Sequence, residues 1–408
     1  MNIQDYYSRI KSEQRHNNML LHLTANETLM SDTARTFMNS RLGDKYFMGG
    51  GDDDGIVDFQ PFTFRGIPAL QALVTEAQIA AKEMLGASDI NFGCLSGVHA
   101  MMCTILSVTD PGDAVMTVDL KHGGHFATKG IVERTGRVHV PTSYNFDTLS
   151  FDVERLAKDF KKAKAKAFYM DVSFYINPHN LLEIRKALGD DAIIIYDASH
   201  TIGLIMGKQF QSPFKEGADV ICANTHKTLP GPQKGLIAFR DQKLADSANA
   251  IINSGLYSSS HTTSMIALAT TILEIKQFGE AYAKQIINNS NKLGEALAKR
   301  GIQVRRANTG RYSENHQVHI FTEEFGNYRK LYTKFLENNI SVNFDNTLGG
   351  YMYIRLGTQE ITRRGMKEKE MEKIAEFLHK SLQSENISNK VSTFMSGYQK
   401  SRYSFDSK

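Results

Sequence analysis

Short apolar segments alternate with amphipathic ones between residues 75 and 240 of this chain. Residues 75–85 have the spacing of a helix, and the expected strands are rich in β-branched residues and nearly continuous in apolar ones: 114–120, 165–172, 192–197, 219–223 and 235–239. Apolar strands separated by helices are typical of a mostly parallel sheet that helices cover on both faces. The pattern therefore predicts an α/β domain over this part of the chain.

A second region begins near residue 264 with a long helix that ends before Gly301, a common helix stop. Further strands are expected at 317–322 and 351–356, and further helices at 328–338 and 367–383, which together describe a smaller α+β unit. Phe394, Met395, Tyr398 and Tyr403 could dock the polar C-terminal residues on the folded part. The predicted division is an N-terminal arm, a large domain, a small C-terminal domain and a polar tail without regular structure: 1–30, 31–263, 264–385 and 386–408.

Composition narrows the choice of function. The 408 residues are too many for one ordinary core, and 48 basic residues against 44 acidic ones lack the basic excess of a nucleic-acid-binding protein. Cys94, Cys103 and Cys222 are scattered and have no CxxC spacing, so we expect reduced core residues and neither a disulfide nor a metal site. Without a signal-like apolar segment or an apolar run of about 18 residues, a cytoplasmic enzyme without membrane contact is expected.

The segment DVICANTHKTLPGPQKGLIAF places Lys227 just after an expected strand. In parallel sheets, ligands bind at this end of the strands. A lysine amine becomes an imine-forming nucleophile when desolvation or a nearby cation lowers its pKa, and a closed site at a strand end can supply that environment. A lysine in a turn is by itself more often a solvated surface residue, so a second signal is needed.

That signal is Asp197, in the segment YDASH at the end of the preceding strand. Pyridoxal phosphate works as an electron sink while its ring nitrogen stays protonated, and a buried carboxylate beside that nitrogen holds the proton. Alone, Asp197 would more often cap the following helix. An aspartate followed thirty residues later by Lys227 is a more specific signal than either residue alone, and it predicts a pyridoxal phosphate site.

These motifs resemble those of a known family. DASHTIGLI and THKTLPGPQKG are similar to DxAHxxGL and THKTLxGPxxG of the serine hydroxymethyltransferases, which are fold-type I pyridoxal phosphate enzymes. Further matches follow in the family's order: LSG at 95–97, KHGGH at 121–125, IRLGTQEITRR at 354–364 and, more loosely, LTANET at 23–28. The resemblance implies an α/β fold-type I transferase with a mostly parallel sheet in the large domain and a smaller C-terminal α+β domain.

The resemblance also implies roles for individual residues. Lys227 would hold the cofactor as a Schiff base, Asp197 would pair with the ring nitrogen, and His125 would stack on the ring. Other cofactor contacts would come from the phosphate turn and from residues near the Schiff base: Ser96, Gly97, Ser173, His200, Thr225 and His226. The residues that bind the amino acid substrate would be Arg355, Tyr46 and Glu27, and Tyr46 would reach into the neighbouring subunit's site. The expected assembly is a homodimer with shared sites, and a tetramer stays open.

The chain departs from the family on the folate side. Met48 stands where the family has an essential glutamate, and the segment 257–263, YSSSHTT, replaces a glycine-rich loop. Val98 replaces the second serine of the family's phosphate turn. Losing a carboxylate removes a proton-transfer group worth about a hundredfold in rate. Folate-dependent transfer is therefore in doubt, whereas cofactor chemistry at the amino acid Cα is not.

The resulting hypothesis is a transferase or aldolase that breaks and forms the Cα–Cβ bond of β-hydroxy-α-amino acids without folate, resembling the threonine transaldolases. The base for the hydroxyl proton is open between Glu27, His200 and a carboxylate in residues 52–54. One alternative is a folate-dependent serine hydroxymethyltransferase, and another is a different reaction at Cα. A non-catalytic partner protein with this fold is the alternative from another class. The sequence does not identify the acceptor aldehyde.

Overall fold

The computed structural model describes residues 2–407 except 53, 60, 326 and 346–350. The chain divides into two compact units. The large unit comprises Thr28–Lys284 and Tyr403–Lys408, and the small unit comprises Met1–Glu27 and Gln285–Arg402. This division differs from the one predicted, because the N-terminal arm belongs to the small unit and the last residues belong to the large one.

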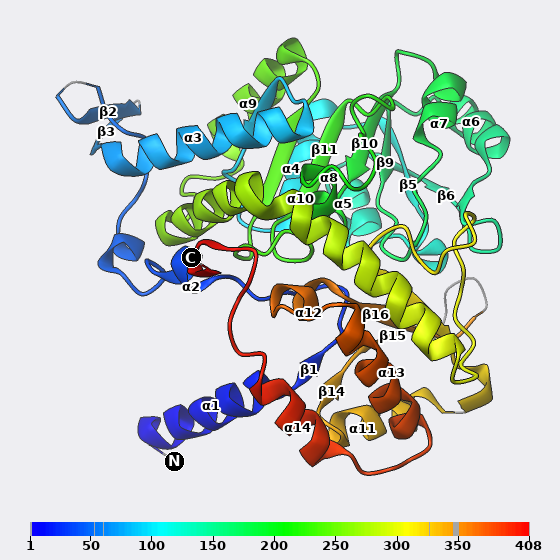
Figure 1. Ribbon diagram of the computed structural model, residues 1–408. Helices are drawn as coiled ribbons and strands as arrows, with labels where there is room; N and C mark the ends of the chain where they lie inside the picture. Colours follow the sequence, from blue (N-terminus) through cyan, green and yellow to red (C-terminus); the bar gives the residue numbers. More distant parts are fainter. Residues whose placement is uncertain (1, 53, 60, 326, 346–350, 408) are drawn as a thin grey trace. The chain divides into compact units, whose positions relative to one another are not determined.

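The large unit is built on a seven-stranded sheet in the order β4-β12-β11-β10-β9-β5-β6. Its strands from β11 to β6 are parallel, and β12 and β4 add antiparallel pairings at one edge. The strands are β4 (Asp89–Asn91), β12 (Gly235–Phe239), β11 (Val220–Asn224), β10 (Ile193–Asp197), β9 (Ala167–Met170), β5 (Ala114–Val118) and β6 (Val138–Thr142). The prediction of a mostly parallel sheet is confirmed (Figure 1), and the one strand that runs against the others is β12, next to the edge strand β4.

Helices α4 and α9 pack on one face of this sheet, over the fully buried side chains of Val115, Tyr169, Ile195, Cys222 and Ile237. The helices of the large unit are α2 (Asp32–Arg35), α3 (Pro68–Leu85), α4 (Gly97–Val108), α5 (Thr128–Arg134), α6 (Val153–Lys162), α7 (Leu181–Leu188), α8 (Ile202–Met206), α9 (Gln242–Gly255) and the first part of α10 (Thr262–Ala298). Its smaller elements are η1 (Arg41–Asp44), the hairpin β2 (Ile56–Phe59) and β3 (Phe62–Arg65), η2 (Leu120–His122), β7 (Tyr144–Asn145), β8 (Ser150–Phe151) and η5 (Phe405–Ser407). None of the helices in the described part of the chain is both long and apolar enough to cross a membrane.

The small unit contains an antiparallel sheet in the order β13-β16-β15 and a short parallel pair, β1 with β14. Its strands are β1 (Leu21–His22), β13 (Gln317–Phe321), β14 (Ile340–Ser341), β15 (Asn343–Asp345) and β16 (Tyr353–Gly357). Its helical elements, besides the second part of α10, are α1 (Ile3–Asn18), η3 (Glu323–Phe325), α11 (Tyr328–Glu337), α12 (Gln359–Arg363), α13 (Glu368–Leu382) and α14 (Ser388–Ser396). The predicted α+β character of this region is confirmed.

The structure corrects the expectation that residues 386–408 lack regular structure. Residues 388–396 form α14, whose Val391 and Met395 are completely buried in the core of the small unit. Further on, the carboxylate of Asp406 accepts hydrogen bonds from the backbone N–H groups of Asp32 and Thr33, both at 2.8 Å, and so caps the first turn of α2. The few apolar residues in this polar segment keep it ordered, because they are buried in the folded core.

We predict that Met395→Ala lowers the free energy of unfolding by about 2–5 kcal/mol, because it leaves a cavity in a packed core. Chemical denaturation followed by circular dichroism measures this value. Lys390→Ala, on the exposed side of the same helix, is the matched control and should change stability little. Equal stabilities for the two variants would contradict the docking of α14.

Candidate active site

Lys227 lies in the turn that joins β11 to β12, and its Nζ is 3.2 Å from Nε2 of His200. His200 follows β10 and is 4% exposed. The two residues therefore come from neighbouring strands and meet at the carboxyl ends of the parallel strands, where the sequence predicted them. A buried imidazole within hydrogen-bonding distance of an amine can exchange a proton with it.

One hydroxyl joins the two strand-end segments that carry these side chains. Thr228 Oγ1 donates a hydrogen bond to the carbonyl of His200 at 2.9 Å and accepts one from the N–H of Gly203 at 3.1 Å. A Cβ atom at Gly203 would lie 2.3 Å from the carbonyl oxygen of Thr228, so only glycine permits this approach. The glycine of the DASHTIGLI motif is explained by this contact.

Asp197 ends β10 with both carboxylate oxygens engaged. The phenol of Tyr169 donates to Oδ2 at 2.8 Å, and the backbone N–H of Ser199 donates to Oδ1 at 2.9 Å. Each carboxylate oxygen has a second lone pair that can accept a further donor. The carboxylate is thus fixed in orientation, and burial together with the charge of Asp197 raises the pKa of Tyr169, which keeps this phenol a donor.

His125 is positioned by a residue that the sequence reasoning missed, Asp171. The Asp171 carboxylate accepts hydrogen bonds from the N–H groups of His125 and Val118 and from the hydroxyl of Thr128. Burial raises the pKa of Asp171 to about 7. Burial also lowers the pKa of His125, and the positive charge of Lys227 lowers it further. The His125 ring is therefore mainly neutral near pH 7.

The Gly123-Gly124 turn before His125 is held against Ser173. The hydroxyl of Ser173 donates to the carbonyl of Gly123 at 3.1 Å, and its backbone N–H donates to the same oxygen at 2.9 Å. A Cβ atom at Gly124 would lie 2.0 Å from the carbonyl oxygen of Val118, which explains the second glycine of KHGGH. Ser173 therefore stabilises the turn that precedes His125 through two hydrogen bonds to the carbonyl of Gly123.

Ser96 and Gly97 begin α4. Ser96 caps the helix, its Oγ accepting from the N–H of His99 at 3.1 Å, and its O–H can still donate to a ligand. A Cβ atom at Gly97 would lie 2.7 Å from Cβ of Asn224, so the turn packs closely on the end of β11. A capped helix start of this kind binds anions through its backbone N–H groups and the helix dipole.

Thr225 and His226 precede the lysine, and the structure gives Thr225 a clear task. Its hydroxyl donates to the carbonyl of Pro232 and accepts from the N–H of Lys234 at 3.1 Å, which closes the turn around Lys227. Lys234 is 1% exposed, its Nζ donates to the carbonyl of Ser260 at 2.7 Å, and burial lowers its pKa to about 8. His226 is partly buried in the same turn.

Two of the predicted substrate residues belong to the small unit. Arg355 lies on the central strand β16, opposite His319 of β13 and Asn343 of β15. Burial, and then the charge of Arg355, lower the pKa of His319, so that this neighbour stays neutral. The Glu27 carboxylate is half-exposed and accepts the hydroxyl of Thr24.

In the large unit, Tyr46 is 60% exposed and its ring packs edge-on against Phe64 at 6.3 Å. Met48, which departs from the family pattern, lies near Tyr46 in the sequence and lines a cavity of about 410 Å³. Its walls include Phe47, Met48, Gly93, Tyr257, Ser258 and Ser260. Met48 and the 257–263 segment are distant in the chain, and the structure brings them together at this cavity.

Comparison with known proteins shows the family of this chain. The family model described as serine hydroxymethyltransferase matches residues 2–378. The chain belongs to the serine hydroxymethyltransferase family. A serine hydroxymethyltransferase of Methanocella arvoryzae is 32% identical over 403 residues, which cover 95% of this chain and 92% of that protein.

Two further proteins that resemble this chain carry a different name. The fluorothreonine transaldolase of Streptantibioticus cattleyicolor is 34% identical over 371 residues, covering 90% of this chain. The chain spans 58% of the length of that relative. The crystal structure of L-threonine transaldolase from Pseudomonas fluorescens, in its internal aldimine state, superposes with a TM-score of 0.91 at 28% identity, covering 99% of this chain and 94% of that one.

The family motifs point to the side chains that we expect to act, and they do not point to the residues that hold these side chains in place. Asp171, Tyr169 and Lys234 were missed. Asp171 directly follows β9 in the segment AFYMDV, so its place after a buried strand was an available signal. Tyr169 and Lys234 offered none, because a tyrosine inside an apolar strand and a lysine in a turn are ordinary core and surface residues.

We predict that wild-type protein loses stability relative to Asp171→Asn as the pH rises from about 4 to about 7. The folded carboxyl keeps its proton up to its raised pKa of about 7, whereas the unfolded carboxyl releases it near 3.8. The difference should change by up to about 1.4 kcal/mol per pH unit. Denaturation curves of both proteins at several pH values measure it, and Asp191→Asn, at an exposed turn, is the control. If the stabilities of wild type and Asp171→Asn changed with pH in the same way, Asp171 would not hold a proton in the folded protein.

Proposed function

We propose that this protein binds pyridoxal phosphate in the large unit. The residues fit the cofactor: an amine at Lys227, an oriented carboxylate at Asp197 and a capped helix start at Ser96 and Gly97 lie at the ends of adjacent elements. Lys227 would bind the cofactor covalently, Asp197 would hold a proton at the ring nitrogen, and the start of α4 would receive the phosphate. When bound, pyridoxal phosphate supplies an electron sink for bond breaking at Cα.

The chain's own groups would divide the remaining tasks. His125, mainly neutral near pH 7, would stack on the cofactor ring without adding a charge there. His200 is a buried base beside Lys227 Nζ, and it would accept or return a proton at that nitrogen. Arg355 would bind the substrate carboxylate through its guanidinium, a geometry that favours two parallel hydrogen bonds.

The reaction we propose is glycyl transfer between aldehydes, with a β-hydroxy-α-amino acid such as threonine as donor and no folate. The observation that carries this proposal is Met48 in the wall of the 410 Å³ cavity, where the family pattern has a glutamate. A thioether cannot transfer protons, so Met48 cannot take the part of the glutamate in folate-dependent transfer. The similarity to proteins named as threonine transaldolases supports the same choice.

His200 is the base we favour for the β-hydroxyl proton. It is buried beside Lys227, whereas Asp52 and Asp54 are exposed and Asp53 lies outside the described residues. The carboxylate of Glu27 is half-exposed, accepts the Thr24 hydroxyl and lies 3.8 Å from His22 Nδ1, so it already has local partners.

A homodimer is the assembly we propose. On α1, Ile3, Tyr6, Tyr7 and Ile10 are each more than half exposed and recur at a spacing of three and four, so they form one apolar face. Tyr46 is a further large exposed side chain. A second copy of the chain would cover these groups, and light scattering of the purified protein tests it.

The direct test of the reaction is release of acetaldehyde from L-threonine by protein loaded with pyridoxal phosphate. We expect acetaldehyde release that is unchanged by tetrahydrofolate and increases with an added acceptor aldehyde, which takes the glycyl unit and leaves as a new β-hydroxy-α-amino acid in place of free glycine. Lys227→Ala should abolish turnover. Turnover of L-serine that strictly requires tetrahydrofolate would contradict the proposal and indicate serine hydroxymethyltransferase activity.

Two variants distinguish the role of the Asp197 carboxylate from that of Tyr169, which orients it. Asp197→Asn should lower kcat on the order of a hundredfold or more, since it removes the group that holds the ring proton. Tyr169→Phe removes one hydrogen bond to that carboxylate and should lower kcat about tenfold. Steady-state kinetics on both variants measures the ratio. An Asp197→Asn variant as active as wild type would contradict the assigned role.

A further inference from the structure

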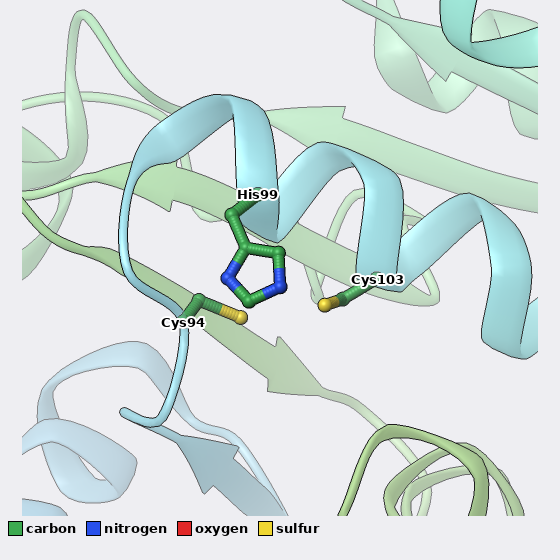
Figure 2. A group of neighbouring side chains, drawn as sticks. All are labelled: Cys94, His99 and Cys103. Atoms are coloured by element: carbon green, nitrogen blue, oxygen red, sulfur yellow. The ribbon is translucent and has the colours of Figure 1, made fainter. Parts of the chain in front are cut away.

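Three side chains that the proposed reaction does not use meet at the start of α4. Cys94 precedes the helix, and His99 and Cys103 lie one turn apart on it, so that their ligand atoms all lie within 4.8 Å of one another. Figure 2 shows the imidazole of His99 beside the two sulfur atoms. The sequence reasoning treated Cys94 and Cys103 as scattered, but the turn between β4 and α4 brings them together.

The protonation of His99 follows from its hydrogen bonds. Nδ1 accepts the backbone N–H of Leu95 at 3.0 Å, so the ring proton resides on Nε2. Nε2 lies 3.0 Å from the carbonyl of Leu256, so the one ring proton is shared between that carbonyl and the neighbouring sulfur of Cys103. The backbone of Leu95 thus turns the protonated side of the imidazole toward Leu256 and Cys103.

The two thiols have different tendencies to ionise. The S–H of Cys94 donates to Cys103, and this bond, together with the one from His99, lowers the pKa of Cys103 to about 6. The same contact, with burial, raises the pKa of Cys94. Near pH 7 the pair is therefore a thiolate at Cys103 beside a thiol at Cys94, which is the arrangement of a reactive dithiol.

Two thiols and one imidazole are also ligands that zinc accepts. Here the local hydrogen bonds oppose an ion. Metal binding at Nε2 would displace the ring proton while the N–H of Leu95 still occupies Nδ1, and metal binding at Nδ1 would displace the N–H of Leu95. A covalent bond between the sulfur atoms requires neither change.

We propose that Cys94 and Cys103 form a reversible disulfide when the protein meets a small peroxide. The Cys103 thiolate attacks one peroxide oxygen, the O–O bond breaks, and the sulfur becomes a sulfenic acid while hydroxide leaves and takes a proton to become water. The Cys94 sulfur then attacks the Cys103 sulfur, the S–OH bond breaks, and a second water leaves with the Cys94 proton. Two thiols are oxidised and one peroxide is reduced to two waters.

Access to the pair restricts the oxidant. Cys94 and Cys103 are each 0% exposed, so an oxidant reaches them only when the chain around them opens, and a small peroxide needs the least opening. The cavity of about 410 Å³ is lined by Gly93, which precedes Cys94, and by Tyr257, whose ring stands edge-on to His99 at 6.4 Å. Direct neighbours of the dithiol therefore line this cavity.

Cys222 is the internal comparison. It is equally buried, but burial and the charge of Asp197 raise its pKa, so it stays a thiol. Because the thiolate is the nucleophile, we expect peroxide to oxidise the pair and to leave Cys222 reduced.

The experiment treats the native protein with hydrogen peroxide, then unfolds it, alkylates the remaining thiols and measures the intact mass and peptide map. We expect the alkylated thiols to fall from three to one, a peptide that links Cys94 to Cys103, and full reversal by a thiol reductant. Cys222→Ser should form the same linked peptide. Cys94→Ser should leave a sulfenic acid on Cys103 that reacts with dimedone, and Cys103→Ser should leave Cys94 reduced.

Three outcomes would overturn the proposal. One is loss of Cys222 at the same rate as Cys103. Another is absence of the linked peptide although circular dichroism shows a folded protein. The third is tight zinc retention by the reduced protein that needs both Cys94 and Cys103 and blocks oxidation. None of these readouts depends on catalysis, so they stay informative if the proposed function fails.

A consequence for the cofactor rests on the proposed function. Cys94 is two residues from Ser96, so closing the disulfide would shift the turn that offers N–H groups to the phosphate. We expect the Kd for pyridoxal phosphate to rise several-fold in the oxidised protein and to recover on reduction. An unchanged Kd in protein shown by mass to be oxidised would contradict this coupling, whereas reduced protein that binds no cofactor would contradict the proposed function instead.

Discussion

The hydroxyl of Thr228 is the contact on which the candidate site depends. It bridges the segment after β10 and the turn after β11, donating to His200 and accepting from Gly203. Parallel pairing aligns β10 with β11 but leaves the segments beyond the strands free to diverge. The Thr228 hydroxyl joins the two segments through the backbone of His200 and Gly203, and this brings Lys227 Nζ within 3.2 Å of His200 Nε2.

Hydrogen bonds between backbone N–H groups and side chains recur at the candidate site and at the Cys94–Cys103 pair. The N–H of Ser199 fixes Asp197, the carboxylate of Asp171 fixes the backbone of His125, and the N–H of Leu95 selects the tautomer of His99. Backbone donors cost little conformational entropy to place once the strands have formed. Preorganisation of this kind is what a site needs to hold charge without rearranging.

The sequence predicted the elements that have a regular apolar pattern and the residues that belong to a chemical motif. The apolar runs predicted β5, β9, β10, β11, β12, β13 and β16, and the motifs placed Asp197 and Lys227 at strand ends, where they lie. The short strands β4, β6, β14 and β15 were not predicted. The hydroxyl of Thr225 closes a turn, Ser173 is seen supporting one, and Cys94 lies against Cys103; none of these follows from spacing, because each depends on how non-local segments pack. The order of the last residues was missed for a related reason, since a few buried side chains outweigh a polar composition.

The path of the chain through its two units has a consequence for biosynthesis. The small unit uses residues from the beginning of the chain and residues up to Arg402, whereas the large unit is complete but for six residues once Lys284 has been made. A ribosome releases the chain from the N-terminus onward, at about 5–20 residues per second. The large unit can therefore fold while α1 and β1 wait, unpaired, for partners still to be translated, and chaperones would have their longest opportunity to bind at that first segment.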